Sequence, residues 1–596
     1  MNPTANRNTP SPYDILLIHA HRDYYFAAAD GIAIGTLLLA SVLRDRGLRV
    51  GYFRGFAGET AGWLRAELEA TGARCVGFYC DYENVTLVES LSRMVKSGGE
   101  IPVVVGGPQA FALTEEFFER SRCDFAIRGE AERTLPELLE HLLEGKGCRE
   151  AIDGISYPDG GGRLVRNRDR ELIANLDELP FADFRLERRW PYQKSLPVLS
   201  GRGCPYRCAF CFEGGNTRTV RYRSVGHVMA EIRENLNRRP DLRSVFFLDD
   251  TFTLNRQRVE EFCRELSQLR RQHDFVWFCE GHVQTINRHP DLLPVMVAAG
   301  LVKMAIGIES GCDETLRLYN KQSSAAEIEA AVGRLVRAGV PQVEGNIILG
   351  GPQETKQTAR ASLNLVLRLL RAHPGKFFSG AYFLTPFPGT AITCAPERFG
   401  LKFLPPRVKS GLDDIPQAET EALSIARLFE IRRSFVRRVH SAMSRILHSG
   451  KVPHDSMTSA YRLAARYGIA SRWLQNLTGR VPVTDRYFSL LARGGAVSSR
   501  GIRRGRLMKM HPMRTFEVWN SIRFSEGYPV IQGFALSPLE YDLLCASSGK
   551  RPLGEILQSA FRKFGSSSGD YSEFEKLSMG RLKAFEKKHW LAYSEF

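Results

Sequence analysis

The chain has 596 residues, of which 43% are hydrophobic and 25% charged, a balance typical of globular proteins with several domains. No apolar run approaches the roughly 18 residues that a membrane-spanning helix needs, and residues 1–13 lack the pattern of a signal peptide, so we expect a cytoplasmic protein without a membrane partner. The net charge of +16 invites a nucleic-acid interpretation, but Lys and Arg form no tight block with interleaved aromatic residues, and solvated helix faces explain the excess better.

Residues 1–150 alternate between short apolar runs and amphipathic helical patterns. Alternation of this length predicts a parallel, doubly wound α/β sheet, here a Rossmann-like domain. Ligands bind such sheets beyond the carboxyl ends of the strands. The predicted strands cover 14–19, 49–53, 75–79, 103–106 and 124–127.

Residues 151–196 contain many turn residues and little periodicity, which predicts a strand-containing linker. A second alternating series fills 197–400, and its six βα units fit a partial (β/α)6 barrel better than an open sheet, a preference that rests partly on the resemblance described below. The predicted barrel strands are 197–200, 245–249, 276–279, 302–308, 342–349 and 381–384.

Residues 401–596 are predicted to be mainly α-helical and to cover the substrate side of the barrel. Apolar residues between Ile425 and Ile446 form one amphipathic stripe, and a capping box at 537–540 begins a short helix. A β-like segment at 528–534 and a second helix from Leu553 complete a small module at 515–565.

Three cysteines, Cys204, Cys208 and Cys211, lie within eight residues directly after the first barrel strand. Three thiolates can hold three irons of a 4Fe–4S cubane and leave the fourth iron open. A structural zinc ion would need a fourth protein ligand, and His227 stands alone near this loop. The pattern therefore favours an iron–sulfur cluster with one open iron.

This spacing, with Phe210 before the last cysteine, resembles the radical S-adenosylmethionine (SAM) superfamily, and the resemblance extends over 197–390. It implies a 4Fe–4S cluster, SAM and an electron donor such as flavodoxin or ferredoxin. In that family SAM chelates the open iron and its sulfonium is cleaved to a 5′-deoxyadenosyl radical. The SAM-binding residues implied by the resemblance are Asp249, Asp250, Glu309, Ser310 and Gly350.

The N-terminal residues resemble the cobalamin-binding domain that precedes the barrel in one large radical SAM class. Gly106 and Gly107 lack a Cβ, so the backbone there can approach a flat ligand or its nucleotide tail, although an ordinary tight turn would explain this pair taken alone. The resemblance implies cobalamin-binding residues at Gly106, Gly107, Pro108, Gln109, Gly129 and Glu130.

One departure from that class concerns the lower face of the cobalt ion. The Asp-x-His-x-x-Gly signature, which supplies a cobalt-binding histidine in many cobalamin proteins, does not occur in this sequence. The lower face is then left to the loop after the third strand, where Cys80, Asp81 and Tyr82 are the candidates and the sequence does not choose among them. Tyr82 is also a candidate catalytic residue.

Glu280 lies at the end of the third barrel strand and is the second candidate catalytic residue. It could contact SAM or occupy the open iron, and the latter would suit polar methyl transfer, as in the cobalamin-dependent tryptophan methylases. The simpler alternative is that Glu280 forms an ion pair at the end of the strand and has only a structural role. His282 stands where related enzymes often carry an arginine, so the family's usual role does not transfer to it. Cys279 is expected to face the other side of the strand.

These residues predict a cobalamin-dependent radical SAM methyltransferase that acts, through methylcobalamin, on an unactivated carbon or phosphorus. The alternatives are a cobalamin-dependent cyclase or ring-rearranging enzyme without methyl transfer and, third, a tRNA methylthiotransferase. The module at 515–565 resembles the winged-helix peptide-recognition modules of peptide-modifying enzymes, which would imply a precursor peptide as substrate. A plain helical subdomain would leave a small natural-product intermediate as the expected substrate.

Overall fold

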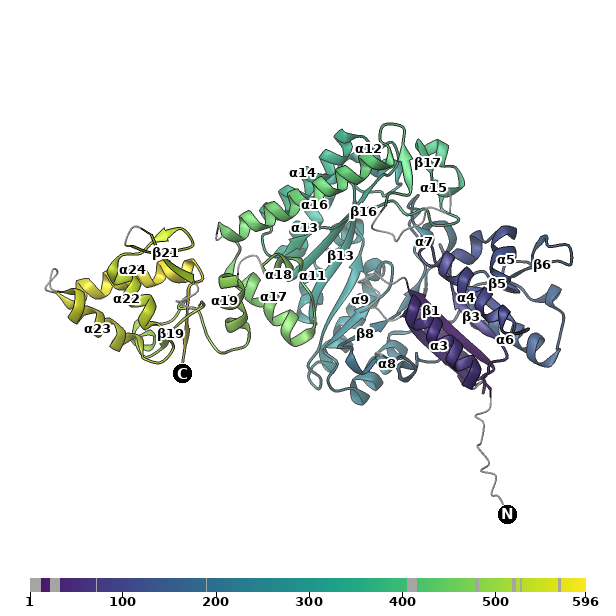
Figure 1. The fold of residues 1–596 in the computed structure, drawn as a ribbon, viewed down its shortest axis with the longest axis horizontal. Helices are drawn as coiled ribbons and strands as arrows, with labels where there is room; N and C mark the ends of the chain where they lie inside the picture. The colour runs from purple at the N-terminus through teal and green to yellow at the C-terminus, as the bar shows by residue number, and fades with distance from the viewer. Residues whose placement is uncertain are drawn as a thin grey trace, which may run out of the picture. The chain divides into compact units, whose positions relative to one another are not determined.

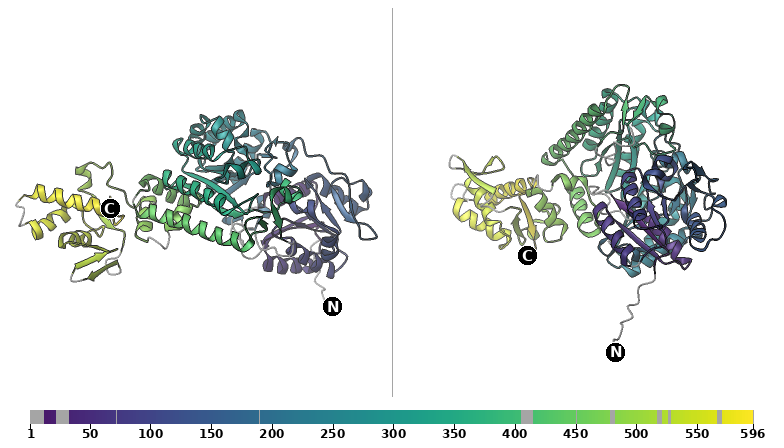
Figure 2. Two further views of the ribbon diagram at one scale, coloured as in Figure 1. Left: turned by 90° about the horizontal axis from the view of Figure 1, so that it is seen from above. Right: turned by 45° about the vertical axis from the view of Figure 1, so that its right-hand side comes forward.

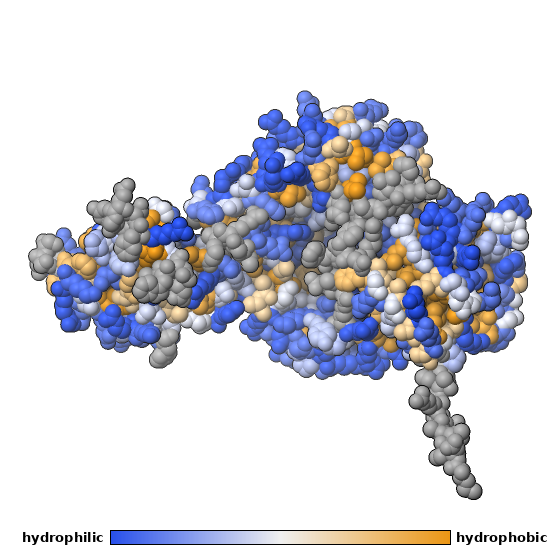
Figure 3. Space-filling model, in the orientation of Figure 1, coloured by the Kyte–Doolittle hydropathy of each residue, from blue (hydrophilic) through white to orange (hydrophobic). Residues whose placement is uncertain are grey.

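The computed structural model describes residues 12–21, 33–70, 72–188, 190–404, 415–449, 451–477, 482–516, 521–525, 528–565 and 570–595 (Figure 1). The chain divides into two compact units. The first consists of Met1–Ala338, Glu344–Leu365 and Ser379–Val436, and the second of Gly339–Val343, Val366–Phe378 and Arg437–Phe596. Among the described residues, no helix is long and apolar enough to cross a membrane. Hydrophilic residues cover much of the face seen in Figure 3.

The first unit begins with a seven-stranded sheet in the order β2-β1-β3-β4-β5-β6-β7. Strands β1 to β5 pair in parallel and have almost wholly buried side chains, as expected for a sheet covered on both faces. The predicted α/β sheet is therefore confirmed. Its strands are β1 Ile15–His21, β2 Val50–Phe56, β3 Val76–Tyr79, β4 Val103–Gly106, β5 Phe125–Ile127, β6 Ile155–Pro158 and β7 Leu164–Arg166.

Strands β6 and β7 come from the segment predicted as a linker, and they extend the sheet as an antiparallel hairpin. Buried Arg128 holds this hairpin by donating hydrogen bonds to the carbonyl oxygens of Ile155 and Asn167, both at 2.6 Å. The sequence predicted strands in this segment but not their positions, because both strands are short and β7 lies largely at the surface.

Five helices of the described residues cover the N-terminal sheet. Helices α2 and α6 contact each other, and so do α3 with α4 and α4 with α5. The direction of the crossovers reverses between β1 and β3, so right-handed connections place these two groups on opposite faces, and the reversal creates a crevice at the carboxyl ends of the strands. The helices are α2 Ile34–Asp45, α3 Ala57–Ala70, α4 Val85–Ser97, α5 Glu115–Ser121 and α6 Ala131–Glu144.

The second sheet of the first unit has the order β8-β11-β12-β13-β14, with β16 also beside β14. The pairs β8–β11, β11–β12, β12–β13 and β14–β16 are parallel, and all six predicted barrel strands are present. This confirms the partial (β/α)6 barrel. The strands are β8 Ser195–Val198, β11 Ser244–Phe247, β12 Val276–Gly281, β13 Leu301–Glu309, β14 Gln342–Leu349 and β16 Ala381–Phe383.

Helices cover the outside of the curved barrel sheet (Figure 2). Helix α13 begins with a capping box, in which Ser324 and Glu327 satisfy each other's backbone N–H groups. The helices are α7 Phe212–Asn216, α8 Val225–Arg238, α9 Arg256–Leu269, α10 Val283–Arg288, α11 Leu292–Ala298, α12 Asp313–Leu318, α13 Ala325–Arg337, α14 Lys356–Ala372 and α15 Ala391–Cys394.

The C-terminal region is mainly helical, as predicted. The capping box of Ser537 and Glu540 begins α22, with Pro538 at its first position. Short antiparallel strands accompany these helices: β19 His511–Arg514 with β23 Leu591–Ser594, and β20 Ile522–Ser525, β21 Tyr528–Ile531 and β22 Phe534–Ala535. The helices are α16 Ile425–His448, α17 His454–Tyr467, α18 Arg472–Leu477, α19 Pro482–Ala492, α20 Arg504–Leu507, α22 Pro538–Ala546, α23 Leu553–Phe564 and α24 Tyr571–Lys587.

A buried ion pair fastens the N-terminal sheet to the segment that leads into the barrel. Arg54 of β2 donates a 2.8 Å hydrogen bond to Glu187, and each side chain is only 1% exposed. Tyr52 lies beside the same carboxylate, with its hydroxyl 3.4 Å away. Two charges withdrawn from water are tolerated only while both partners remain.

Replacing Glu187 with alanine should therefore destabilise the first unit strongly, by about 3–5 kcal/mol, because Arg54 would remain buried without its counter-charge. Thermal melting and urea unfolding measure the change. Arg163→Ala is the matched control, because its ion pair with Asp159 is exposed, with 85% of the Arg163 side chain accessible, and such pairs contribute about 1 kcal/mol or less. Equal effects of the two substitutions would contradict the prediction.

Candidate functional site

The cysteine loop follows β8 through the short strand β9 (Gly201–Arg202), which pairs with β10 (Arg221–Tyr222). Gly203 has a φ of +85°, and a Cβ at this position would clash with the carbonyl oxygen of Thr219, so glycine is required. The loop is held by backbone hydrogen bonds from Cys204 N to Thr217 O (3.1 Å) and from Ala209 N to Tyr319 O (2.8 Å). These bonds fix the path of the chain between the cysteines.

The thiols of this loop lie beside a buried cation. Burial raises the pKa of Cys204 and of Cys208, while the nearby Lys321 ammonium opposes that shift in both thiols. Lys321 is 7% exposed and lies over the Phe210 ring, 5.9 Å from its centroid. A neighbouring cation favours the thiolate form, the form that binds iron.

A second charge fixes the position of Lys321. Its Nζ donates to Glu309 Oε1 at 2.9 Å, and both side chains are buried. Gly307 makes room for this pair, because a Cβ there would overlap Glu309 Oε1 and Lys321 Nζ. Glu309 itself has a φ of +58°, an uncommon conformation for a non-glycine residue. The predicted SAM-binding residue Glu309 is the last residue of β13, and it pairs there with the cation that lies beside the cysteine loop.

The donor set fits a cluster better than a single ion. Across the part of the chain that the structure describes, no three His, Cys, Asp or Glu side chains form a group that could hold one metal ion. In a cubane each thiolate binds a different iron, so the three sulfur atoms need not converge on one point. Three thiols with one neighbouring cation match that requirement.

The other predicted SAM-binding residues lie at neighbouring strand ends. Asp249 is buried and accepts hydrogen bonds from Ser200 N (2.7 Å) and Ser200 Oγ (2.6 Å), which ties the end of β11 to that of β8. Ser310 Oγ accepts from Cys312 N at 3.1 Å. Gly350 has a φ of +79° and donates its N–H to the buried carboxylate of Glu354. These residues shape the rim of the barrel.

Glu280 and Asp250 form an acidic wall at the barrel mouth. Desolvation by the surrounding barrel wall raises the pKa of each carboxyl to about 7, although both side chains keep contact with solvent. Neighbouring carboxylates add to the shift: Glu344 and Glu309 act on Glu280, and Glu213 and Glu280 act on Asp250. The Glu280 side chain is accessible to solvent, whereas Cys279 is 1% exposed, so the two residues face opposite sides of β12 as predicted.

His282 caps helix α10 and packs against the cysteine loop. Its ring stacks on Tyr206, with centroids 3.7 Å apart, and its Nδ1 accepts from Gln284 N at 3.3 Å. Burial lowers the pKa of His282 to about 3, and the charge of Lys321 adds to that shift, so the ring is neutral. His282 thus supports the loop between Cys204 and Cys208.

A cavity of about 660 Å³ lies between the carboxyl end of the N-terminal sheet and the barrel mouth. Its volume falls within the range of cofactor and ligand pockets. The N-terminal wall includes Gly77, Tyr79 and Ile127, and the barrel wall includes Gly203, Phe212 and Asn216. Six predicted site residues line the cavity: Gly106, Gly107, Pro108, Gly129, Glu130 and Asp250.

The turn after β4 is shaped for a close approach to this cavity. Gly107 has a φ of +101°, and a Cβ there would lie 2.6 Å from Cys80 O and 3.0 Å from the Tyr79 ring. Gln109 donates its backbone N–H to Cys80 O at 3.1 Å, and its buried Oε1 has no hydrogen-bond partner among the described residues. An unsatisfied buried acceptor beside a glycine-lined cavity fits a ligand that carries amide donors, as cobalamin does.

The loop after β3 contains the three candidates for the lower cobalt face, and each of them has different surroundings. Cys80 is 0% exposed and belongs to the apolar core of the N-terminal domain. Asp81 Oδ1 accepts from the backbone N–H groups of Glu83 (2.9 Å) and Asn84 (3.2 Å). Tyr82 is buried, and its ring lies 6.5 Å from that of Phe387 in the barrel. These three side chains are outside the cavity lining.

The role of Glu130 is one that the sequence did not reveal. Its Oε1 accepts from Arg202 Nη1 and its Oε2 from Arg221 Nη1, both at 2.9 Å, while Ile173 N donates to Oε2 at 2.8 Å. Burial alone would raise the pKa of Glu130, but these partners lower it overall, so the carboxylate is ionised. The residue therefore both borders the cavity and bridges the two parts of the first unit.

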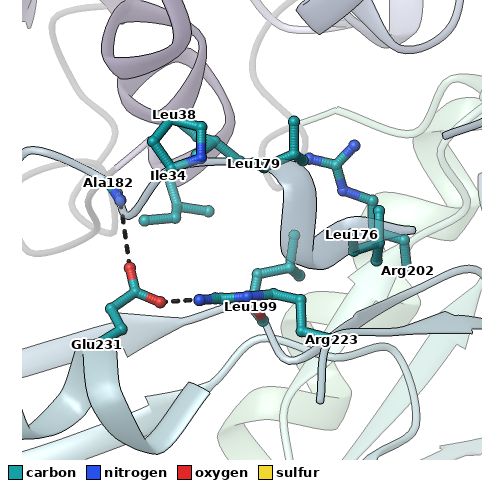
Figure 4. A pocket seen from close by; sticks show the side chains of 10 residues that line it. Ile34, Leu38, Leu176, Leu179, Ala182, Leu199, Arg202, Arg223 and Glu231 are labelled. Atoms are coloured by element: carbon teal, nitrogen blue, oxygen red, sulfur yellow. Dashed lines mark hydrogen bonds and ion pairs between the residues drawn. The ribbon is translucent and has the colours of Figure 1, made fainter. Parts of the chain in front are cut away.

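Figure 4 shows the side of this joint that faces α2, where a void of about 20 Å³ remains, large enough for one water molecule. Glu231 accepts there from Ala182 N (3.3 Å) and Arg223 Nη1 (2.6 Å). Leu38 and Leu199 complete the apolar part of its lining. The void is too small for a cofactor.

Lys321 and Tyr79 were also missed as site residues. Lys321 belongs to no motif, and only the positive φ of Asn320 and Gln322 around it marks a special loop. Tyr79 could have been found, because it is the last residue of an apolar strand in a sheet that binds ligands at that edge.

Gly107→Ala should lower the melting temperature and the amount of cobalamin bound per chain. The new methyl group would meet Cys80 O at 2.6 Å in a conformation that L-residues rarely adopt, at a cost of about 1–3 kcal/mol. Gly62→Ala in α3 is the control, since an added Cβ there meets no atom within 4 Å and the residue is outside the cavity lining. The prediction fails if both variants melt like the wild type.

The stability gained by Glu354→Gln relative to the wild type should increase as the pH rises. Burial raises the pKa of Glu354 to about 7, so in the folded state it keeps a proton that the unfolded chain loses above about pH 4.5, and wild-type stability falls through that window. The full effect is on the order of 3 kcal/mol. Differential melting from about pH 5 to 8 measures it, with the exposed Glu397→Gln as control. A difference independent of pH would contradict this assignment.

Comparisons with known proteins agree with this geometry. The family model for the radical SAM superfamily matches residues 198–366, and the model for the B12 binding domain matches residues 27–139. The first match contains the cysteine loop and four of the six barrel strands, β11, β12, β13 and β14, and it starts at the last residue of β8. The second contains Tyr79, Gly107 and Glu130.

Curated relatives share part of the chain. An uncharacterized methyltransferase, PH0819, of Pyrococcus horikoshii is 29% identical over 299 residues, which is 49% of this chain and 62% of that protein. The anaerobic magnesium-protoporphyrin IX monomethyl ester cyclase of Rubrivivax gelatinosus is 27% identical over 267 residues, 44% of this chain and 47% of that protein. The chain thus spans less than two thirds of the length of each relative.

Solved structures share the fold. TsrM from Kitasatospora setae, with cobalamin and a 4Fe–4S cluster bound, has a TM-score of 0.58 at 15% identity and covers 81% of this chain and 99% of its own. OxsB with aqua-cobalamin and SAM has a TM-score of 0.60 at 14% identity and covers 97% of this chain and 80% of its own. At such identities the likeness concerns the fold alone. Residues 198–366 of the chain thus match the radical SAM superfamily and residues 27–139 match the B12 binding domain, and this pair of domains implies a 4Fe–4S cluster, SAM and cobalamin as cofactors.

Proposed function

We propose that the protein is a cobalamin-dependent methyltransferase, which moves the methyl group of SAM to an unactivated carbon or phosphorus of its substrate. The observation that carries this proposal is the single cavity between the Gly107 turn and the barrel mouth. Methyl transfer by way of cobalamin needs both cofactors to reach one space from which water is excluded. When bound, cobalamin supplies a cobalt centre that accepts and donates a methyl group.

The residues of this chain would hold and orient the cofactors. Cys204, Cys208 and Cys211 would bind the cluster, with Lys321 compensating part of its negative charge. Asp250 and the strand ends at Glu309 and Gly350 would hold SAM. Tyr79, together with the Gly106–Gln109 turn, would contact cobalamin, and the buried Gln109 Oε1 would accept a hydrogen bond from an amide of the cofactor.

For the lower face of the cobalt ion we propose a contact with Tyr79 and loop backbone rather than a cysteine ligand. Tyr79 lines the cavity, whereas the Cys80 thiol is enclosed in the apolar core. The Asp81 carboxylate is occupied by two backbone N–H groups, and Tyr82 packs against Phe387. A cobalt centre without a strong lower ligand releases a methyl group more readily. Tyr82 would then position the cavity wall.

Glu280 would act as the proton-exchanging group of the barrel mouth. Its carboxylate is surrounded by other acids, and its pKa of about 7 lets it take up or release a proton under physiological conditions. A direct bond from Glu280 to the open iron is the second role that this position allows. An electron donor such as flavodoxin or ferredoxin would be needed where SAM is cleaved reductively.

The substrate class follows from the C-terminal module, which we propose to be a winged-helix-like peptide-recognition unit at 515–565. Support comes from three short antiparallel strands followed by α22, α23 and α24 around one apolar core that includes Leu543, Ile556 and Leu582. A precursor peptide is the matching substrate. TsrM, a structural neighbour, has been solved with tryptophan as substrate, which keeps a small molecule as the alternative.

The second candidate function is a cyclase or ring-rearranging reaction that uses the same cofactors without methyl transfer. The likeness to the Rubrivivax gelatinosus cyclase is the observation that favours it. The tRNA methylthiotransferase layout is disfavoured because it needs three N-terminal cysteines for a second cluster. Cys75, Cys80 and Cys123 are instead buried in the core of the N-terminal domain.

Anaerobic reconstitution with iron, sulfide, hydroxocobalamin and SAM, together with a strong reductant such as titanium(III) citrate that supplies the two electrons needed to bring cobalt(III) to cobalt(I), separates these functions. A methyltransferase should form S-adenosylhomocysteine in an amount that matches the bound cobalamin, even before a substrate is added, because SAM gives up its methyl group to the cofactor. Chromatography of the products measures this. 5′-Deoxyadenosine without S-adenosylhomocysteine would overturn methyl transfer and favour the cyclase.

The control for this experiment is a pair of cysteine variants. Cys208→Ala should lose bound iron and the visible absorption of the cluster while it still binds cobalamin. Cys279→Ala should keep both, because Cys279 is buried on the other side of β12 from Glu280. Iron retained by the Cys208 variant at the wild-type level would contradict the role of the cysteine loop.

A further inference from the structure

The second unit contains a separate cleft of about 680 Å³ that none of the functions above uses. One wall is helix α24, and the other is the segment that leads into α20 (Arg504–Leu507). The floor is formed by the start of α17 and the middle of α19, through His454 and Tyr487. The volume is that of a small-molecule pocket.

The walls carry an excess of positive charge. Lys576, Lys583 and Lys587 lie at helical spacing on α24, so they share one face of that helix, and Arg500 lies on the other wall. Within the described residues, none of these four side chains forms an ion pair with a carboxylate. Four unneutralised cations on two facing walls create a strong field for an anion.

The two carboxylates of the cleft are already satisfied. Glu575 accepts from Arg504 Nε at 2.7 Å. Glu586 accepts from Ser498 Oγ (2.6 Å) and Ser499 N (2.7 Å). Since each glutamate is held by its own donors, neither neutralises the lysines of α24.

The floor of the cleft is aromatic and uncharged. His454 Nε2 and Tyr487 Oη are 2.8 Å apart, and the His589 ring stacks on Tyr487 with centroids 4.9 Å apart. Burial lowers the pKa of both histidines, that of His589 to about 4, and the neighbouring Arg500 adds to each shift. Both rings are therefore neutral at physiological pH and offer a surface for a flat or apolar group.

The backbone at His589 gives independent support. His589 has a φ of +61° just past the end of α24, a left-handed position that glycine adopts most easily. A histidine in this conformation is strained, and strained residues are often found at ligand sites. Its ring forms part of the cleft floor.

We propose that this cleft binds a small phosphorylated molecule, with its phosphate groups between Lys583, Lys587 and Arg500 and a flat group on the Tyr487 and His589 rings. Arginine and lysine are the usual partners of phosphate, and the cations here surround a bounded space. The inference is independent of the proposed methyl transfer.

Isothermal titration of the full-length protein with ADP and with pyrophosphate tests the proposal. Both probes should bind, more weakly as salt is added, since exposed charges are screened. Replacing Lys583 and Lys587 together by Gln should weaken both probes at least tenfold. The matched control, Lys550→Gln with Arg551→Gln, removes two exposed charges from a turn outside the cleft lining and should leave binding unchanged.

A further variant separates the two halves of the site. His589→Gly relieves the left-handed backbone and removes the ring, so it should weaken ADP several-fold more than pyrophosphate without lowering the melting temperature. The proposal is overturned if neither probe binds, if the control pair weakens binding as much as the cleft pair, or if a glutamate-rich peptide competes at lower concentration than ADP.

Discussion

The carboxylate of Glu130 is the contact on which the functional arrangement depends. It is ionised, and it accepts hydrogen bonds from Arg202 of β9 and Arg221 of β10 on the barrel side. Because Glu130 also borders the large cavity, the same residue ties the N-terminal wall of that cavity to the β9–β10 pair beside the cysteine loop. The buried Arg54–Glu187 pair supports this joint from the other end of the sheet.

Within the barrel, a second buried pair of opposite charges lies beside the cysteine loop. Lys321 lies between the thiols and Glu309, and Gly307 leaves the space that this pair requires. Among the described residues, no Lys or Arg lies at hydrogen-bond distance from the acids further along the rim, Asp250 and Glu280, and their pKa values are raised to about 7. The charge of Glu309 is thus paired with a cation, whereas that of Asp250 and Glu280 depends on pH near neutrality.

Local pattern was sufficient to predict the strands and the cysteine loop. Each barrel strand lies in or beside an apolar run of the sequence, so the strands could be predicted from local pattern alone. The spacing of Cys204, Cys208 and Cys211 likewise predicts three sulfur ligands without any knowledge of the fold. The partners of Glu130 could not be predicted in this way, since they lie 72 and 91 residues further along the chain. Likewise, periodicity predicted a helical end to the chain but did not reveal the cleft, which depends on how α24 meets the segment around Arg500.

The hairpin of β6 and β7 has a consequence for how this protein can be dissected. Strand β5 has β4 on one side and β6 on the other, and β6 begins only at Ile155. A fragment that stops at residue 150 would leave the N–H and C=O groups of one edge of β5 without partners, in an apolar strand that invites pairing with other chains. A cobalamin-binding fragment that folds alone would have to extend beyond Asp169, so that it keeps both β6 and the residues with which Arg128 forms hydrogen bonds.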